Sequence, residues 1–150
     1  MKKTLLLASV ALFLTTSCRK DDDDKAENYS IVGTWKIVKY ETRSGKDNSI
    51  LYSENNSGCQ ANDTFEFKND GKYAFVYYDD YNQPCGISET ENGTYNYNTA
   101  TKVLTIKSSD NTSEISEIES IDKNQMILTD DSSDYNSDGV ADKRLIYFNR

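Results

Sequence analysis

The chain has 150 residues, which suits one domain, and 36% of them are hydrophobic, which is enough for one modest core. It contains no histidine, and this excludes Ser/His/Asp and Cys/His catalysis and every histidine-ligated metal site. The formal net charge is -8 with no basic patch to neutralise phosphates, so we expect no binding to nucleic acid.

Residues 1–17 have the pattern of a secretory signal peptide. Lys2 and Lys3 precede an apolar run over residues 5–14, too short to span a membrane, and small residues lead to Cys18. The exit resembles the lipobox of bacterial lipoproteins, although Thr15 stands where that pattern usually has leucine. The resemblance implies acylation of Cys18, with palmitate among its chains, as the first residue of the mature protein. An ordinary cleaved signal is the alternative.

Residues 18–29 are predicted to form an acidic tether. Four aspartates, Asp21 to Asp24, follow Arg19 and Lys20 directly, and like-charge repulsion would extend such a segment. Removing Lys2 and Lys3 lowers the 17 basic residues to 15 against 25 acidic ones, a net charge of -10. The run resembles the export signal of Bacteroidetes lipoproteins, which implies a lipid anchor in the outer membrane facing the cell surface. A periplasm-facing anchor is the alternative.

The first strands come after the tether. Residues 31–40 predict a strand with Trp35 and Ile37 on one face, and residues 41–61 predict a long connection with local strand character at 50–52. Residues 62–68 and 72–79 then predict a β-hairpin, joined by Asn69, Asp70 and Gly71.

The hairpin places two cysteines at one end. Cys59 precedes its first strand and Cys85 follows its second, so antiparallel pairing brings them together and predicts a disulfide. Such a bridge would stabilise the fold by roughly 3 to 4 kcal/mol. Two unpaired buried thiols are the alternative.

The second half of the chain continues the strand pattern. A loop is expected over 80–92, followed by strands at 93–98 and 102–108. In residues 112–121 isoleucines recur every three positions, which favours a strand with a bulge over a helix, the alternative. Further strands are predicted at 125–129 and 143–149. Eight short strands predict an all-β fold over residues 30–150, an eight-stranded antiparallel up-and-down barrel.

Several motifs resemble the lipocalin-like domain of Bacteroidetes-type outer-membrane lipoproteins. They are Gly33-Thr34-Trp35, Cys59, Asp63, Phe65, Phe67, Asp70-Gly71-Lys72-Tyr73, Cys85, Gly93-Thr94-Tyr95 and Leu104-Thr105-Ile106. The resemblance implies a small barrel with a cavity and supplies no catalytic residues. It also places Trp35 at the position of the tryptophan that packs across the barrel base in lipocalins.

Two functions fit these observations. One is a lipid-anchored surface protein that binds a small apolar or amphipathic ligand, and the other is a structural or interaction lipoprotein whose barrel is filled. Acidic pairs such as Asp79-Asp80 or Glu89 with Glu91 are expected to be solvated, so no enzyme activity is predicted. Six tyrosines are expected in the core and barrel wall, with a ligand pocket as the alternative: Tyr73, Tyr77, Tyr78, Tyr81, Tyr95 and Tyr97.

Residues 134–142 carry the last motif. Asp134, Asn136 and Asp138 alternate before Gly139, and the Val140 carbonyl and Asp142 would complete a set of oxygen ligands. The loop resembles the calcium loops of EF-hand, dockerin and thrombospondin type 3 repeats, although Leu145 stands where an EF-hand has its last glutamate. It predicts a weak calcium site, with an ordinary polar hairpin loop as the alternative.

Overall fold

The computed structural model describes residues 29–81, 84–131 and 133–150. The predicted signal peptide, Cys18 and nearly all of the predicted tether lie outside the described residues. The described residues form one short 3-10 helix, η1 (Cys59–Asn62), which is far too short to span a membrane. They also form nine strands: β1 (Gly33–Arg43), β2 (Ile50–Asn55), β3 (Thr64–Phe67), β4 (Lys72–Asp79), β5 (Gly86–Asn98), β6 (Val103–Ser108), β7 (Ser113–Ile121), β8 (Gln125–Asp131) and β9 (Lys143–Asn149).

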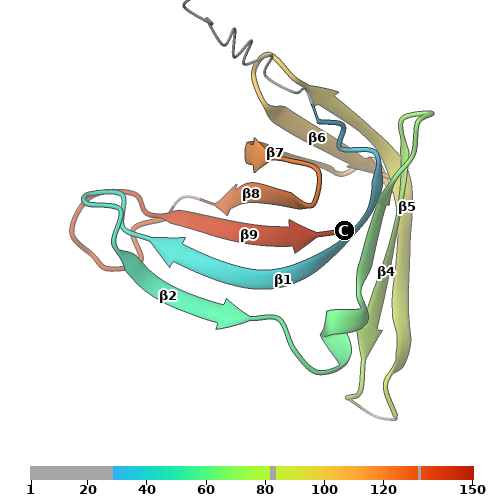
Figure 1. Cartoon of the computed structure of the whole chain (residues 1–150), viewed down its shortest axis with the longest axis horizontal. Helices are drawn as coiled ribbons and strands as arrows, with labels where there is room; N and C mark the ends of the chain where they lie inside the picture. Colours follow the sequence, from blue (N-terminus) through green and yellow to red (C-terminus); the bar gives the residue numbers. More distant parts are fainter. Residues whose placement is uncertain (1–28, 82–83, 132) are drawn as a thin grey trace, which may run out of the picture.

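The strands form one antiparallel sheet that closes on itself, because β1 pairs with β9 as well as with β3 (Figure 1). Strand β1 together with β3 to β9 makes an eight-stranded up-and-down barrel, so the predicted architecture is confirmed. β2 is an additional strand. Among the described strands it pairs with β1 alone, along residues 39–43 of β1.

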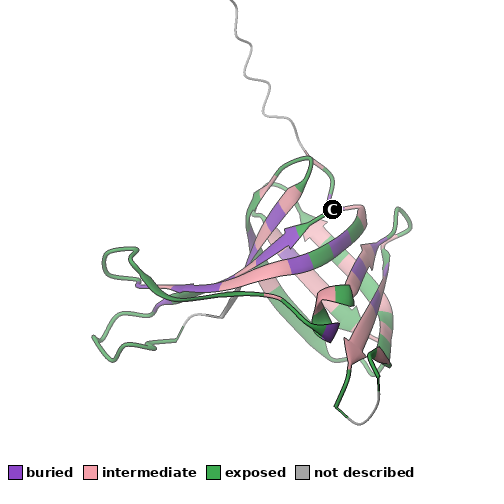
Figure 2. Cartoon of the chain, turned by 60° about the horizontal axis from the view of Figure 1, so that its bottom comes forward, coloured by how far each residue is buried: buried purple, intermediate pink, exposed green. Residues whose placement is uncertain are grey.

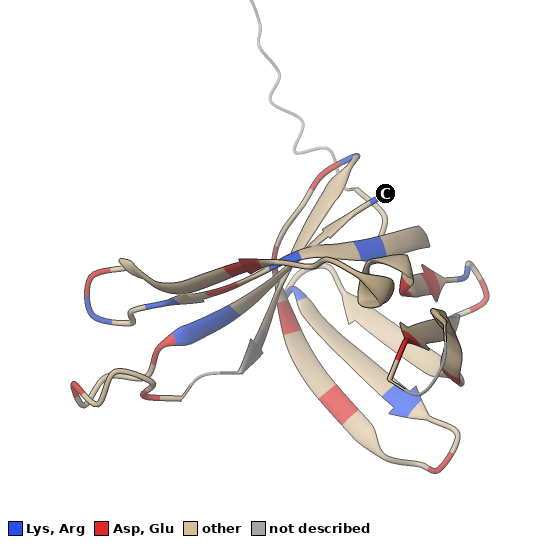
Figure 3. Ribbon diagram, turned by 90° about the horizontal axis from the view of Figure 1, so that it is seen from below, with Lys and Arg blue, Asp and Glu red and all other residues tan. Residues whose placement is uncertain are grey.

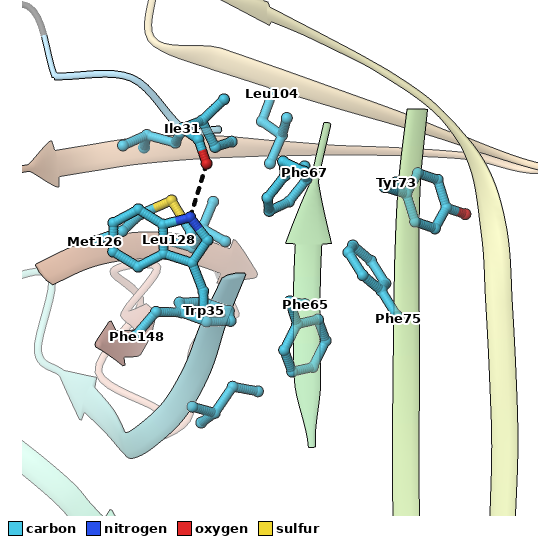
Figure 4. Packing of buried hydrophobic residues seen from close by; sticks show 12 residues of the cluster. Ile31, Trp35, Phe65, Phe67, Tyr73, Phe75, Leu104, Met126, Leu128 and Phe148 are labelled. Atoms are coloured by element: carbon cyan, nitrogen blue, oxygen red, sulfur yellow. Dashed lines mark hydrogen bonds between the residues drawn. The ribbon is translucent and has the colours of Figure 1, made fainter. Parts of the chain in front are cut away.

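The core fills the barrel around Trp35, which is fully buried (Figure 4). The indole Nε1 donates to the Ile31 carbonyl at 2.7 Å, and the Arg150 guanidinium lies 4.2 Å from the indole ring centroid. The end of the barrel at which Ile31, Trp35 and Arg150 meet is called the base, and the opposite end is called the mouth. The core cluster consists of Ile31, Trp35, Ile37, Phe65, Phe67, Tyr73, Phe75, Leu104, Ile118, Met126, Leu128 and Phe148.

The predicted disulfide is confirmed. Cys59 in η1 is bonded to Cys85 in the turn between β4 and β5, with their Cα atoms 5.5 Å apart. The bridge fastens η1 to the hairpin of β4 and β5 at the mouth.

The structure corrects the prediction for residues 80–92, extends the one for residues 50–52, and decides between strand and helix for residues 113–121. The loop expected over 80–92 is wrong, since β5 begins at Gly86 and pairs with β4 from there. The strand character expected at 50–52 extends to all of β2. Residues 113–121 form a strand whose register shifts between Ile118 and Ser120, which confirms the bulged strand over the helix.

Candidate functional site

At the mouth, β1 and β9 continue beyond the barrel, and β2 pairs with the projecting end of β1. The extension is defined as β2, the adjoining ends of β1 and β9, and the loops 44–49 and 133–142. It projects to the left in Figure 1, and buried positions run along it in Figure 2. Both signs of charge occur on its loops (Figure 3). The barrel wall therefore does not stop at the mouth but continues as a platform.

One face of the extension continues the inner wall of the barrel. Tyr40 packs against the core cluster and pairs with Ile146 of β9 and Glu54 of β2. Thr42, two residues further out, pairs with Arg144 on one side and with Tyr52 on the other. Because alternate residues of a strand share a face, these side chains line a surface that leads out of the core.

Two adjoining cavities occupy this surface, and together they are called the vestibule. The first has a volume of about 490 Å³ and is lined by Thr42, Leu51, Tyr52, Tyr135 and Asn136. The second has a volume of about 390 Å³ and is lined by Tyr40, Thr42, Tyr52, Glu54, Gln60, Tyr135 and Arg144. They share Thr42, Tyr52 and Tyr135. Each is within the range of about 300–1,000 Å³ that is typical of small-molecule pockets.

Asp142 fixes one wall of the vestibule. Its side chain is fully buried, and its carboxylate accepts the backbone N–H groups of Gly45 at 3.0 Å, Tyr135 at 2.8 Å and Asn136 at 3.3 Å. A Cβ atom at Gly45 would lie 1.9 Å from the Ala141 carbonyl oxygen, so the two loops touch through their backbones. The buried carboxylate therefore joins loop 44–49 to loop 133–142 and holds Tyr135 at the vestibule.

The predicted calcium ligands lie together in loop 133–142, where they bind backbone groups. The Asp134 carboxylate accepts the N–H groups of Asp138 at 3.0 Å and Gly139 at 2.9 Å. The Asn136 amide donates to Asp138 at 3.1 Å, and Asp138 also accepts the Val140 N–H at 2.9 Å. Among the described residues no group of three or more acidic or cysteine side chains is arranged to hold a metal ion.

Both carboxylate oxygens of Asp142, the last predicted calcium ligand, accept backbone N–H groups, one from Gly45 and the other from Tyr135 and Asn136. Its position shows why the motif is compatible with a purely structural loop. Calcium binding remains a prediction.

The opposite side of the mouth is acidic. Glu91 and Glu89 pair with Phe75 and Tyr77, so they face inward, and the Tyr73 hydroxyl donates to the Glu91 carboxylate. Burial, and secondly Glu91, raises the pKa of Tyr73 to about 12. Burial also raises the pKa of Tyr77, and the charges of Glu91, Glu114 and Glu89 add to the effect. Three glutamates therefore act on one tyrosine of the inner wall.

A charged cluster that the sequence analysis missed lies on the outer face of the extension. Glu41 is only 2% exposed and accepts hydrogen bonds from Lys39 at 2.6 Å, Arg43 at 2.5 Å and the Tyr147 hydroxyl at 3.0 Å. Burial raises the pKa of Glu41, but the three hydrogen bonds together outweigh it, and the net pKa is lowered. The alternation of Lys39, Glu41 and Arg43 in the sequence is the signal that could have revealed it.

The barrel interior toward the base is packed with aromatic rings. The ring centroid of Phe65 lies 4.8 Å from that of Phe75 and 5.4 Å from that of Phe148 (Figure 4), and 5.7 Å from that of Tyr77. Phe75 and Tyr77 belong to β4 and Phe148 belongs to β9. None of these four rings lines either cavity of the vestibule.

The six tyrosines of the predicted cluster differ in how far they are buried. Tyr73 is in the core, and Tyr77, Tyr95 and Tyr97 pack against it, as predicted. Tyr78 is half-buried on β4. Tyr81 is 88% exposed next to the turn between β4 and β5, so its placement in the core or wall is wrong. A turn beyond the mouth has no opposing layer to bury it.

Comparisons with known proteins matched this chain to one protein family and to several solved structures. The model of the lipocalin-like domain family matches residues 31–128. A dog lipocalin allergen has a similar structure, with 15% identity, a TM-score of 0.41, and coverage of 81% of this chain and 74% of its own. Aphrodisin, a sex pheromone from female hamster, gives 12% identity, a TM-score of 0.39 and coverage of 81% and 75%. No curated protein sequence matches.

The family match begins at Ile31, just before β1, and ends within β8, so it spans most of the barrel strands. The chain therefore belongs to the lipocalin-like domain family.

Proposed function

We propose that this protein is a lipid-anchored, surface-exposed binding protein that takes a small amphipathic ligand at the mouth of its barrel. The observation that supports this most directly is the vestibule, whose apolar and polar cavities share Thr42, Tyr52 and Tyr135. Lipocalin-like proteins typically bind small hydrophobic ligands, and this supports a ligand with an apolar part. The vestibule differs from a deep barrel cavity because none of Phe65, Phe75 and Phe148 lines it. No catalytic role is proposed.

A structural or interaction lipoprotein is the second candidate. The contacts of Phe65 with Phe75 and Phe148 favour it, because a barrel filled by its own side chains needs no ligand. The two candidates differ in whether the vestibule binds a small molecule.

Titration with the uncharged fluorophore N-phenyl-1-naphthylamine separates these candidates. We expect saturable binding to the native protein. In Tyr52→Ala the binding should be weaker by about tenfold, because loss of the ring removes a contact worth roughly 1.4 kcal/mol. Tyr135→Ala should behave alike. Tyr81→Ala is the matched control, because Tyr81 is exposed and lines neither cavity. Absence of saturable binding, or equal binding by all variants, would leave the structural candidate.

The lipid anchor is proposed from the sequence. The leader and the small-residue exit before Cys18 support it, and the acidic run after Cys18 supports the outer face of the outer membrane. Cys18→Ala is expected to move the protein from the membrane to the soluble fraction, as measured by fractionation and immunoblotting. A variant that stays with the membrane contradicts the anchor. Protease treatment of intact cells tests surface exposure, and a protein left uncut would indicate the periplasmic face.

A further inference from the structure

We infer that the head group of the ligand is uncharged and rich in hydroxyl groups, as in a sugar ring, and that it lies between Glu54 and Arg144. This inference rests on the proposed function and specifies the ligand class of the same vestibule. The apolar part of the ligand would lie in the adjoining cavity, over Leu51 and the ring of Tyr52.

The charges of the vestibule favour an uncharged head group. Glu54 and Arg144 line the same cavity of about 390 Å³. A negative head group that pairs with Arg144 would therefore be repelled by Glu54, and a positive head group that pairs with Glu54 would be repelled by Arg144. An anionic head group faces a further penalty, because the chain carries a net charge of -8 and Glu89 and Glu91 face the same mouth. Fatty acid carboxylates are therefore disfavoured.

The hydrogen-bonding groups favour hydroxyls. The Gln60 amide and the Thr42 hydroxyl each provide a donor and an acceptor, while the Glu54 carboxylate accepts and the Arg144 guanidinium donates. A sugar hydroxyl also donates and accepts, so neighbouring hydroxyls of one ring can satisfy groups of both kinds. The Tyr52 hydroxyl already donates to one oxygen of the Glu54 carboxylate, and a ketone or ether head group, which supplies acceptors alone, would add no donor for the other oxygen.

Aromatic rings supply the apolar contacts. Tyr52 is 53% exposed and Tyr135 is 50% exposed, and both line both cavities. The face of a tyrosine ring is weakly negative, which suits the C–H groups of a sugar ring or an alkyl chain. Because Asp142 fixes the backbone of Tyr135, this wall is ordered before binding, and little conformational entropy is lost there.

A series of ligands with alkyl tails of seven or eight carbons tests the head group directly. The probes are n-octyl β-D-glucopyranoside, octanoate and octyltrimethylammonium, each below its micellar concentration and titrated as competitors of N-phenyl-1-naphthylamine. We expect the glucoside to bind tightest, by about tenfold over both charged probes. In Glu54→Gln the affinity for octanoate should rise, and in Arg144→Gln the affinity for octyltrimethylammonium should rise. These two variants are matched controls, because Glu54→Gln keeps the positive charge of Arg144 and Arg144→Gln keeps the negative charge of Glu54.

Three results would overturn the inference: tightest binding by a charged probe, equal binding by all three, or no competition by the glucoside. In each case continued binding of the fluorophore, weakened in Tyr52→Ala, would leave the proposed function intact. Loss of fluorophore binding from the native protein would contradict both. Methyl β-D-glucopyranoside distinguishes the source of the sugar. Competition by this tail-free probe indicates free saccharides, and competition by the octyl glucoside alone indicates glycolipid-like ligands.

Discussion

The base and the extension of this barrel are stabilised in different ways. At the base, Trp35 is buried among apolar side chains, and its one polar group is bonded to the Ile31 carbonyl. In the extension, the buried groups include the carboxylates of Glu41 and Asp142, each held by several donors. Apolar packing tolerates changes of pH, whereas buried carboxylates depend on their partners. The stability of the extension is therefore expected to depend on pH through Glu41.

The largest expected effect is at the base. Trp35→Ala should lower the free energy of unfolding by about 3–5 kcal/mol, because it leaves a cavity in the core and removes the ring contact with Arg150. Urea denaturation followed by circular dichroism measures the loss. Trp35→Phe keeps most of the volume and should cost less. A loss below 1 kcal/mol in Trp35→Ala would show that the base does not dominate stability.

The next effect concerns the disulfide at the mouth. The double variant Cys59→Ala/Cys85→Ala opens a loop of 26 residues and should lower the free energy of unfolding by about 3 kcal/mol. Denaturation of the native protein with and without a reducing agent provides the control, and reduction should leave the double variant unchanged. Peptide mapping without reduction should show the linked pair, and two alkylated thiols would contradict it.

A smaller effect, with a defined pH dependence, is expected at Glu41. Its pKa in the folded state lies below the ordinary value of 4.5, so its stabilising contribution is present above about pH 4.5 and is lost as the pH falls through the folded-state pKa. Glu41→Gln should therefore cost about 1–2 kcal/mol at pH 7 and less at pH 3. Denaturation at both pH values measures the difference. A cost that grows as the pH falls would contradict the cluster.

The smallest effect is that of calcium on the extension. At millimolar calcium a site with a dissociation constant of about 10⁻⁴ to 10⁻³ M stabilises the fold by roughly 0.4–1.4 kcal/mol. A thermal melt should therefore shift upward by a few degrees. Asp138→Ala should abolish the shift while keeping the bonds of Asp142 to loop 44–49. A native melting temperature that does not change with calcium, or the same rise in the variant, identifies an ordinary polar loop.

The base was more predictable from the sequence than the mouth. Trp35 and Ile37 alternate with polar residues, so their shared face was visible. The first half of β5 was missed because its inward positions, Glu89 and Glu91, are polar where the wall approaches solvent. The isoleucine spacing around Ile118 did indicate a bulge.

The vestibule could not be predicted from the sequence. Tyr52 and Tyr135 are 83 positions apart by their numbers, and what brings them together is the pairing of β1 with both β2 and β9. Tyr52 lies in no motif, and Tyr135 occupies a position of the predicted calcium loop that supplies no ligand. Asp142 was singled out as a metal ligand, because its acceptor capacity was visible and the three N–H groups that occupy it were not.

The pairing of β1 with β9 also determines when the barrel forms. Arg43 and Tyr147 lie 104 positions apart, yet the Arg43 side chain donates to the Tyr147 hydroxyl at 3.3 Å. The hairpins between β3 and β8 need loops of a few residues, whereas this contact must close most of the chain and so bears the largest loop entropy. Because β9 pairs with β8 across a short connection, folding should pass through an open sheet with unpaired edges on β1 and β9. During that interval the chain is most exposed to strand exchange and aggregation, until β1 pairs with β9.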